Sequence, residues 1–334
     1  MYLPRPSIDN VSRTALGICA YCALISRHPA LRRVYHDPFA AALFSAAAED
    51  GAELLARLPD WASLEAASGE LGDDLRLLCH VAWRKRWMAD HARAHLARDI
   101  DQVVILGAGL DTLSLRLGPA YPDAVFFEVD QTATVAAKQA LVAQLFGPPP
   151  QVRYTAVDFA AETAEARLLD MGYDPKRPAV FIAEVSLEYV PKDDVAETYR
   201  MVRRNGSAGS VFLTTFVLRP DAPESARIVQ TLASTSGAGE PMRFTPTEDE
   251  ARRMCAELGF AVEDWMQGAG VLDYLGRFGV TPGDLPFDAA LQQQSSPSGL
   301  QVHTFRYAPT TGLHVMGYSR TMEADVGLKR AAYL

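Results

Sequence analysis

The sequence feature best suited to bind a ligand is the glycine turn Gly107-Ala108-Gly109. The turn follows a short apolar run, Gln102–Leu106, and precedes a helical pattern that begins at Thr112. A side chain at either glycine would block a ligand that passes close to the backbone. Free N–H groups at the start of a helix point toward such a ligand. The turn therefore predicts a binding site for a nucleotide-like molecule.

Acidic residues stand at the ends of the next two apolar runs. Asp130 closes the run that begins at Ala124, and Asp158 with Phe159 follows the run Val152–Val157. A carboxylate at Asp130 can accept hydrogen bonds from both hydroxyls of a ribose. Asp158 can accept a hydrogen bond from the exocyclic amine of an adenine, and Phe159 offers a flat apolar wall.

A dinucleotide and S-adenosylmethionine (SAM) both contain these groups, but the sequence favours SAM. The dinucleotide fingerprint needs a third glycine where this chain has Thr112. Asp111 would also stand beside a pyrophosphate and repel it. SAM has no phosphate and carries a sulfonium cation, which nearby acids stabilise. Because Glu128 and Asp130 could serve the ribose of NAD(P), an NAD(P)-dependent oxidoreductase is the alternative.

The histidine and cysteine patterns do not predict a metal site. His91 and His95 stand four residues apart, but Ala92 replaces the glutamate of the zinc motif HExxH. Cys19 and Cys22 form a single CxxC pair, and a zinc ribbon needs a second pair. We interpret the histidines as part of a solvated helix face and the cysteines as buried, reduced thiols.

Short apolar runs alternate with helical patterns between residues 102 and 217, which predicts an α/β fold with a doubly wound, mostly parallel sheet. Ligands of such sheets bind at the carboxyl ends of the strands, near the switch in strand order. The expected strands are 102–106, 124–129, 152–157, 179–183 and 210–217, with helices at 132–145, 161–171 and 193–203.

The remaining chain is divided by composition. We predict an N-terminal helical cap over residues 1–100 and a SAM-binding domain over 101–334, with 218–243 as a possible lid insertion. The smaller expectations are a helix at Glu224–Ser234, a capping box on Thr245 and Glu248 opening a helix that ends at Gly259, strands at Phe260–Trp265 and Gly312–Ser319, and a loop at 281–299.

Composition excludes several classes of protein. The 334 residues carry a formal net charge of −9 without a basic stripe, so we expect no nucleic-acid partner. No apolar run reaches the ~18 residues that a membrane span needs, and the N-terminus lacks the layout of a signal peptide. We therefore expect a cytoplasmic protein without a membrane partner. The oligomeric state is left open.

Four motifs follow one another along the chain: VVILGAGLDTLSLRL (103–117), FFEVD (126–130), VDF (157–159) and IAEVSLEYVP (182–191). They resemble the motifs of the leucine carboxyl methyltransferase family, whose bacterial members include O-methyltransferases of the tetracenomycin type. Ser12-Arg13-Thr14-Ala15, Asp37-Pro38-Phe39 and Arg84-Lys85-Arg86 also match. The resemblance covers roughly residues 11–217 and implies a class I methyltransferase fold, a seven-stranded sheet whose last strand runs antiparallel.

The resemblance also implies roles for individual residues. Each residue is assigned its contact with SAM by the position that it occupies in the family motifs. Gly107, Ala108 and Gly109 would approach the amino-acid part, Asp130 the ribose, Asp158 and Phe159 the adenine, Glu184 the ammonium, and Arg84 or Arg86 the carboxylate. Glu188 and Tyr189 are the candidate catalytic residues near the acceptor.

The predicted function is therefore that of a SAM-dependent O-methyltransferase in natural-product biosynthesis, with S-adenosylhomocysteine (SAH) as product. The acceptor would be a carboxylate or a hydroxyl of a small metabolite, polyketide or peptide. A carboxylate is ionised at neutral pH and needs no base, whereas a phenol or alcohol needs one. An acid at Glu188 would disfavour an anionic acceptor unless it is paired. A non-catalytic module with a SAM fold is the third hypothesis.

Overall fold

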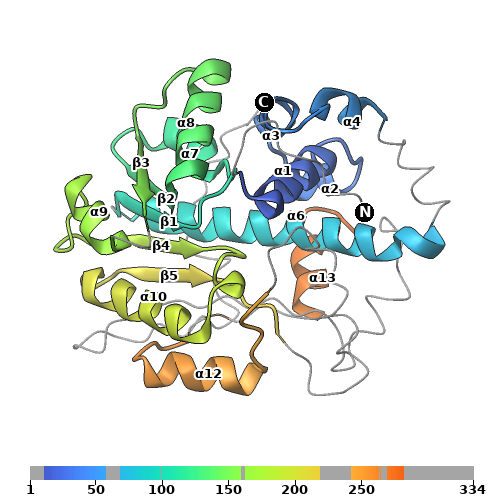
Figure 1. The fold of residues 1–334 in the computed structure, drawn as a ribbon. Coiled ribbons are helices and arrows are strands. Elements are labelled where there is room, and N and C mark those ends of the chain that lie inside the picture. The colour runs from blue at the N-terminus through green and yellow to red at the C-terminus, as the bar shows by residue number, and fades with distance from the viewer. Residues whose placement is uncertain are drawn as a thin grey trace.

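Five parallel strands form the centre of the molecule (Figure 1). The structure is a computed structural model that describes residues 11–57, 68–98, 100–158, 162–218, 242–262, 264 and 269–281. The strand order is β3-β2-β1-β4-β5, so the order reverses between β1 and β4. The strands are β1 Gln102–Leu106, β2 Val125–Gln131, β3 Val152–Val157, β4 Val180–Ala183 and β5 Val211–Thr214.

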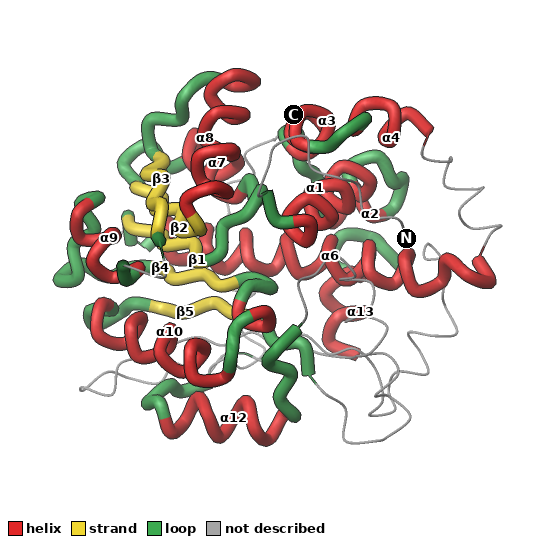
Figure 2. The backbone as a smooth tube through the Cα atoms, in the orientation of Figure 1, coloured by secondary structure: helices red, strands yellow, loops and turns green. Residues whose placement is uncertain are grey.

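Helices cover both faces of this sheet (Figure 2). The core on one face contains residues of α1 Arg13–Ile25, α2 Leu31–Val34, α3 Ala40–Ala47, α4 Gly51–Arg57, α6 Ser68–Leu96, α7 Leu113–Leu117, α8 Thr132–Phe146 and α13 Ala269–Gly276. The other face packs against α9 Ala164–Asp170, α10 Lys192–Asn205 and α12 Glu248–Glu257. Two 3-10 helices, η1 Gly118–Ala120 and η2 Leu187–Tyr189, complete the described elements.

Alternate side chains of each strand enter two separate cores. In β1, Val103 and Ile105 lie in the core of the first face, whereas Val104 and Leu106 lie in that of the second. Every residue of β1 is buried, which explains why its sequence is a continuous apolar run rather than an alternating one. Each fully buried valine or leucine contributes about 1.5–3 kcal/mol. The predicted α/β, doubly wound fold is confirmed.

The five strands predicted between residues 102 and 217 are all present. The capping box of α12 differs from its prediction, because the cap is Thr247 rather than Thr245. The Thr247 hydroxyl accepts from the N–H of Glu250, and the Glu250 carboxylate accepts from the N–H of Thr247. The helix ends before Gly259, whose φ of +82° fits its predicted role as a stop.

The predicted strand at Phe260–Trp265 is not formed in the part of it that the structure describes. The Phe260 ring packs instead against the rings of Tyr199 and Phe212, at centroid distances of 4.9 and 6.1 Å, and anchors the chain after α12. The helix at Glu224–Ser234, the strand at Gly312–Ser319 and nearly all of the lid and the 281–299 loop lie outside the described residues.

Asp37 joins the N-terminal helices to the segment after the glycine turn. Its Oδ2 accepts hydrogen bonds from the hydroxyls of Tyr35 and Thr112 at 2.9 and 2.5 Å. Its Oδ1 accepts from the N–H groups of Phe39 and Ala40 at the start of α3. These buried bonds give the Asp-Pro-Phe motif a structural role, and the N-terminal helices share one core with the sheet. The domain division at residue 100 stays a prediction.

Candidate functional site

A cavity of about 1070 Å³ lies at the carboxyl ends of β1, β2 and β4. This is the place where the strand order reverses, and doubly wound sheets bind their ligands there. The glycine turn, the end of β2 and residues 184–187 line it from the sheet side. Helices α1 and α6 contribute the opposite wall, so the N-terminal helices form part of the site.

The glycine turn has no room for side chains. Gly107 has a φ of +68°, and a Cβ there would lie 2.4 Å from the Cβ of Ser186. Gly109 has a φ of +44°, and its Cβ would lie 3.0 Å from that of Ala15. The N–H groups of Gly107 and Ala108 both donate to the carbonyl of Val129, at 2.9 and 3.1 Å. The turn is therefore held tightly against β2.

A buried ion pair between Glu128 and Lys138 supports the glycine turn. Glu128 and Lys138 are 1% and 2% exposed, and their Oε2 and Nζ atoms lie 2.7 Å apart. Ser114 donates its hydroxyl to Glu128, and Lys138 donates to the carbonyl of Ala108. Burial raises the pKa of Glu128, although the lysine opposes that shift. Glu128 is therefore a structural residue, and it is not among the described residues of the cavity wall.

Asp130 faces the cavity from the end of β2. Its Oδ2 accepts from the N–H of Gly109 at 2.8 Å, and its Oδ1 accepts from that of Gln131 at 2.7 Å. The turn and the carboxylate thus orient each other. Each carboxylate oxygen retains acceptor capacity, since an ionised carboxylate offers about four acceptor positions.

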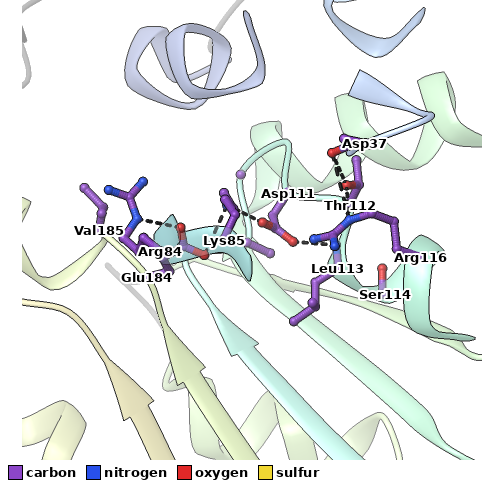
Figure 3. Close-up of polar contacts among 12 residues, drawn as sticks. Asp37, Arg84, Lys85, Asp111, Thr112, Leu113, Ser114, Arg116, Glu184 and Val185 are labelled. Atoms are coloured by element: carbon purple, nitrogen blue, oxygen red, sulfur yellow. Dashed lines mark hydrogen bonds and ion pairs between the residues drawn. The ribbon is translucent and has the colours of Figure 1, made fainter. Parts of the chain in front are cut away.

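Four charged side chains form a buried network of ion pairs at one end of the cavity (Figure 3). They are Arg84, Glu184, Lys85 and Asp111. Arg84 Nε donates to Glu184 Oε1 at 2.8 Å, and Lys85 Nζ donates to Glu184 Oε2 at 3.1 Å. Lys85 also donates to Asp111, whose other oxygen accepts from the N–H of Leu113 at 2.5 Å. The arrangement joins helix α6 to the end of β4 and to the glycine turn.

The two arginines that the sequence left as alternatives lie in different places. Arg84 lines the cavity, and its Nη1 lies 3.0 Å from Nδ1 of His80. Its Nη2 is buried and has no hydrogen-bond partner in the described part of the chain. Arg86 instead binds Asp90 at 2.9 Å and stacks over the ring of Phe278 at 4.3 Å, away from the cavity wall.

The backbone after β4 is strained. Val185 has a φ of +47°, which β-branched residues rarely adopt, at a cost of about 1–3 kcal/mol. Its N–H donates to the hydroxyl of Thr215 at 2.7 Å, which holds this conformation. The strained residue follows Glu184 and precedes Ser186, whose buried Oγ has no partner among the described residues. Strain of this kind is concentrated at functional sites.

The two candidate catalytic residues are separated by the structure. Tyr189 lines the cavity, whereas Glu188 is fully buried and is not part of the wall that the structure describes. Thr215 donates its hydroxyl to Glu188 Oε1 at 3.1 Å, and burial raises the pKa of Glu188 to about 7. A base must reach the proton that it removes, so this position does not support Glu188 as a base.

The structure describes only one of the two predicted adenine contacts. Asp158 is exposed and lies outside the described cavity wall, and Phe159 lies outside the described residues. Glu162 and Thr163, a few residues further along, do line the cavity. Sequence reasoning also missed Lys85 and Ser186, although both stand inside motifs quoted above. A cation between two arginines on a helix, opposite acids at two strand ends, was the signal available for Lys85.

The cysteines and histidines behave mostly as expected. All four cysteines are free and buried, and burial raises the pKa of Cys22 to about 12. His95 is 4% exposed, so the predicted solvated helix face is wrong for it, and His91 stacks on Trp87 at 3.6 Å. Among the residues described, no three His, Cys, Asp or Glu side chains gather to hold a metal. No described helix has the length and apolarity needed to span a bilayer.

Comparison with known proteins places these features in a sequence family. The profile of the family described as leucine carboxyl methyltransferase matches residues 15–203. A Mycobacterium tuberculosis protein that is assigned by name to the S-adenosyl-L-methionine-dependent methyltransferases is 36% identical over 188 residues, which cover 55% of this chain and 51% of that protein. A Mycolicibacterium smegmatis protein assigned to the same class is 30% identical over 240 residues, covering 70% and 72%.

The chain spans about half the length of the first of these curated relatives. Among solved structures, a DUF574 family protein from Streptomyces avermitilis matches with a TM-score of 0.50 and 20% identity. That match covers 73% of this chain and 90% of the other. At this identity the likeness shows the fold alone.

Proposed function

The chain belongs to the leucine carboxyl methyltransferase family, and from this premise we propose that it is a SAM-dependent methyltransferase acting on an acceptor oxygen. The observation that carries the proposal is Arg84, which lines the cavity together with the glycine turn and whose buried Nη2 has no hydrogen-bond partner among the described residues. A buried guanidinium with a free N–H group requires an acceptor. The carboxylate of an amino acid is a suitable one, because the planar guanidinium matches its geometry.

The residues of the cavity fit the parts of SAM. Arg84 would hold the carboxylate, and Glu184, beside it, would hold the ammonium. The backbone of Gly107 and Gly109 would lie against the amino-acid part, where a Cβ has no room. Asp130 would accept hydrogen bonds from the ribose. Asp158 and Phe159 stay the predicted adenine contacts.

When bound, SAM supplies a methyl group that its sulfonium already activates toward displacement. The protein then has to align the acceptor oxygen and exclude water. Among the described wall residues there is no histidine, so the cavity offers no imidazole base there. A carboxylate acceptor needs no base, and we therefore favour a carboxylate of a small metabolite, polyketide or peptide over a hydroxyl. For a hydroxyl acceptor, Tyr189 is the candidate that lines the cavity.

The position of Glu188 removes one objection to a carboxylate acceptor. Its burial outside the described wall keeps its charge away from the acceptor, and a pKa of about 7 leaves it partly neutral at physiological pH. An oxidoreductase is disfavoured, because Glu128 is bound by Lys138 and the helix after the turn has five residues. Such a short helix gives little support to a pyrophosphate.

We expect the protein to transfer label from methyl-labelled SAM to an acceptor in extract of the producing cell. We also expect the variant Asp130→Ala to lose SAM binding. The reason is that Asp130 would hold the ribose and also accepts a hydrogen bond from the N–H of Gly109 in the turn. Titration calorimetry measures the binding, and mass spectrometry identifies the labelled product. A base-labile label indicates an ester and a stable one an ether. SAM binding without any labelled acceptor would support a non-catalytic module, and unchanged affinity in Asp130→Ala would refute the site.

Replacement of the two arginines should separate their roles. We expect Arg84→Met to weaken SAM binding by about 10–100-fold, since hydrogen bonds to charged groups contribute about 1.5–3 kcal/mol. Arg86→Met should leave the affinity within about twofold, because Arg86 binds Asp90 outside the cavity wall. Calorimetric titration of both variants checks this. The reverse order of effects would show that Arg86 holds the carboxylate.

A further inference from the structure

Lys85 lies at the centre of the buried network of ion pairs, although the sequence motifs assigned it no role. Its ammonium contacts Asp111 beside the glycine turn and Glu184 at the end of β4, and these two residues lie 73 positions apart in the chain, since Lys85 is 26 residues from Asp111 and 99 from Glu184. Lys85 is 6% exposed, and its partners are 15% and 10% exposed. One side chain thus joins the segment after the glycine turn to the end of β4, across the switch in strand order between β1 and β4 (Figure 3).

The lysine carries its charge in this position. Burial alone would disfavour the ammonium, but the carboxylates of Asp111 and Glu184 raise its pKa above the usual range. The pKa of Asp111 is held well below its usual range by Lys85, against the effect of burial. Together with Arg84, the group contains two cations and two carboxylates, so it is neutral as a whole.

Lys85 also fixes the direction of Glu184. The two oxygens of that carboxylate accept from different residues, Oε1 from Arg84 and Oε2 from Lys85. Without Lys85 the Glu184 carboxylate would keep only its bond from Arg84 among these contacts, and the direction of the Arg84 guanidinium would be less firmly fixed. Asp111 would become a buried carboxylate without its closest cation, which is strongly unfavourable.

We propose that Lys85 is a positioning residue for the cofactor, which sets the geometry of Glu184, Arg84 and the glycine turn without touching the methyl group. The inference rests on the proposed function, because it assumes that SAM occupies this cavity. A purely electrostatic role makes a different prediction. SAM carries a positive sulfur and SAH does not, so loss of a nearby cation would by charge alone favour SAM over SAH.

The test compares SAM and SAH binding to Lys85→Met by titration calorimetry, with the melting temperature measured without ligand. We expect both affinities to fall by at least about tenfold and by similar factors, as is usual when one partner of a buried charge pair is removed. Arg93→Met is the matched control, because Arg93 pairs with Asp90 on the same helix outside the cavity. That control should bind both molecules as the wild type does.

If Lys85→Met does not fold, Asp111→Asn is the variant to test. Asparagine has nearly the same shape as the aspartate that contacts Lys85. Asp111→Asn should weaken SAM and SAH equally, although less than Lys85→Met. Unchanged affinities in these variants would overturn the inference, and so would a loss confined to SAH in Lys85→Met or to SAM in Asp111→Asn. Failure of the wild type to bind SAM would instead overturn the proposed function.

Discussion

Gly107→Ala is expected to reduce the affinity for SAM by more than about 100-fold. The added Cβ would lie 2.4 Å from the Cβ of Ser186, which is far inside van der Waals contact, and the φ of +68° disfavours any side chain. The turn must therefore move away from Val129 and from Ser186. A misplacement of about 1 Å costs about 100-fold in the rate of an enzyme reaction, and we expect a loss of at least that size in SAM affinity here. Titration calorimetry with SAM measures the effect.

Gly172→Ala is the matched control for this variant. Gly172 has a φ of +89° at the end of α9, but the structure leaves open space around its Cβ position. The control therefore carries the backbone cost of about 1–2 kcal/mol without a steric clash. It should lower the melting temperature and leave SAM affinity unchanged. If Gly107→Ala behaves in the same way as Gly172→Ala, the glycine turn does not contact the ligand.

The sheet could be predicted from sequence because its strands are short apolar runs, and every residue of β1, β4 and β5 is buried. Runs such as Gln102–Leu106 and Val152–Val157 contrast with the helical patterns around them, and their bounds match the structure. The element after α12 was harder, because Phe260 is buried by its ring contacts and not by pairing with a strand. An apolar residue after a helix has the same appearance in both cases.

The residues of the candidate site differ in the same way: local sequence predicts some of them, whereas others depend on distant parts of the chain. The glycine turn follows from local sequence alone, since a tight turn after a strand needs no distant partner. Lys85 does not, because its partners are 26 and 99 residues away and its role depends on where α6 crosses the sheet. Glu188 is a second residue whose surroundings cannot be read from local sequence. Its motif suggested a residue near the acceptor, but side-chain direction within η2 sends it toward Thr215 and the core.

Glu188→Gln is expected to change the free energy of unfolding in a pH-dependent way. The change should be about 3 kcal/mol more stabilising at pH 8 than near pH 4.5. Burial raises the pKa of Glu188 from 4.5 to about 7, so the folded protein keeps a proton that the unfolded chain releases between these values. Native stability therefore falls as pH rises through this interval, and the full cost is present above pH 7. Glutamine cannot ionise, and its carbonyl oxygen can still accept from Thr215.

Urea unfolding of the wild type and of Glu188→Gln at several values between pH 5 and pH 8 measures this difference. The gap between the two free energies of unfolding should widen steadily with pH and level off above pH 7. Glu197→Gln is the control, because Glu197 is exposed and the hydrogen bond from Arg204 lowers its pKa. That control should not show stabilisation that grows with pH. A constant gap for Glu188→Gln would mean that Glu188 is already ionised in the folded protein near pH 5. Its Oε2, which has no hydrogen-bond partner in the described part of the chain, would then be solvated by water.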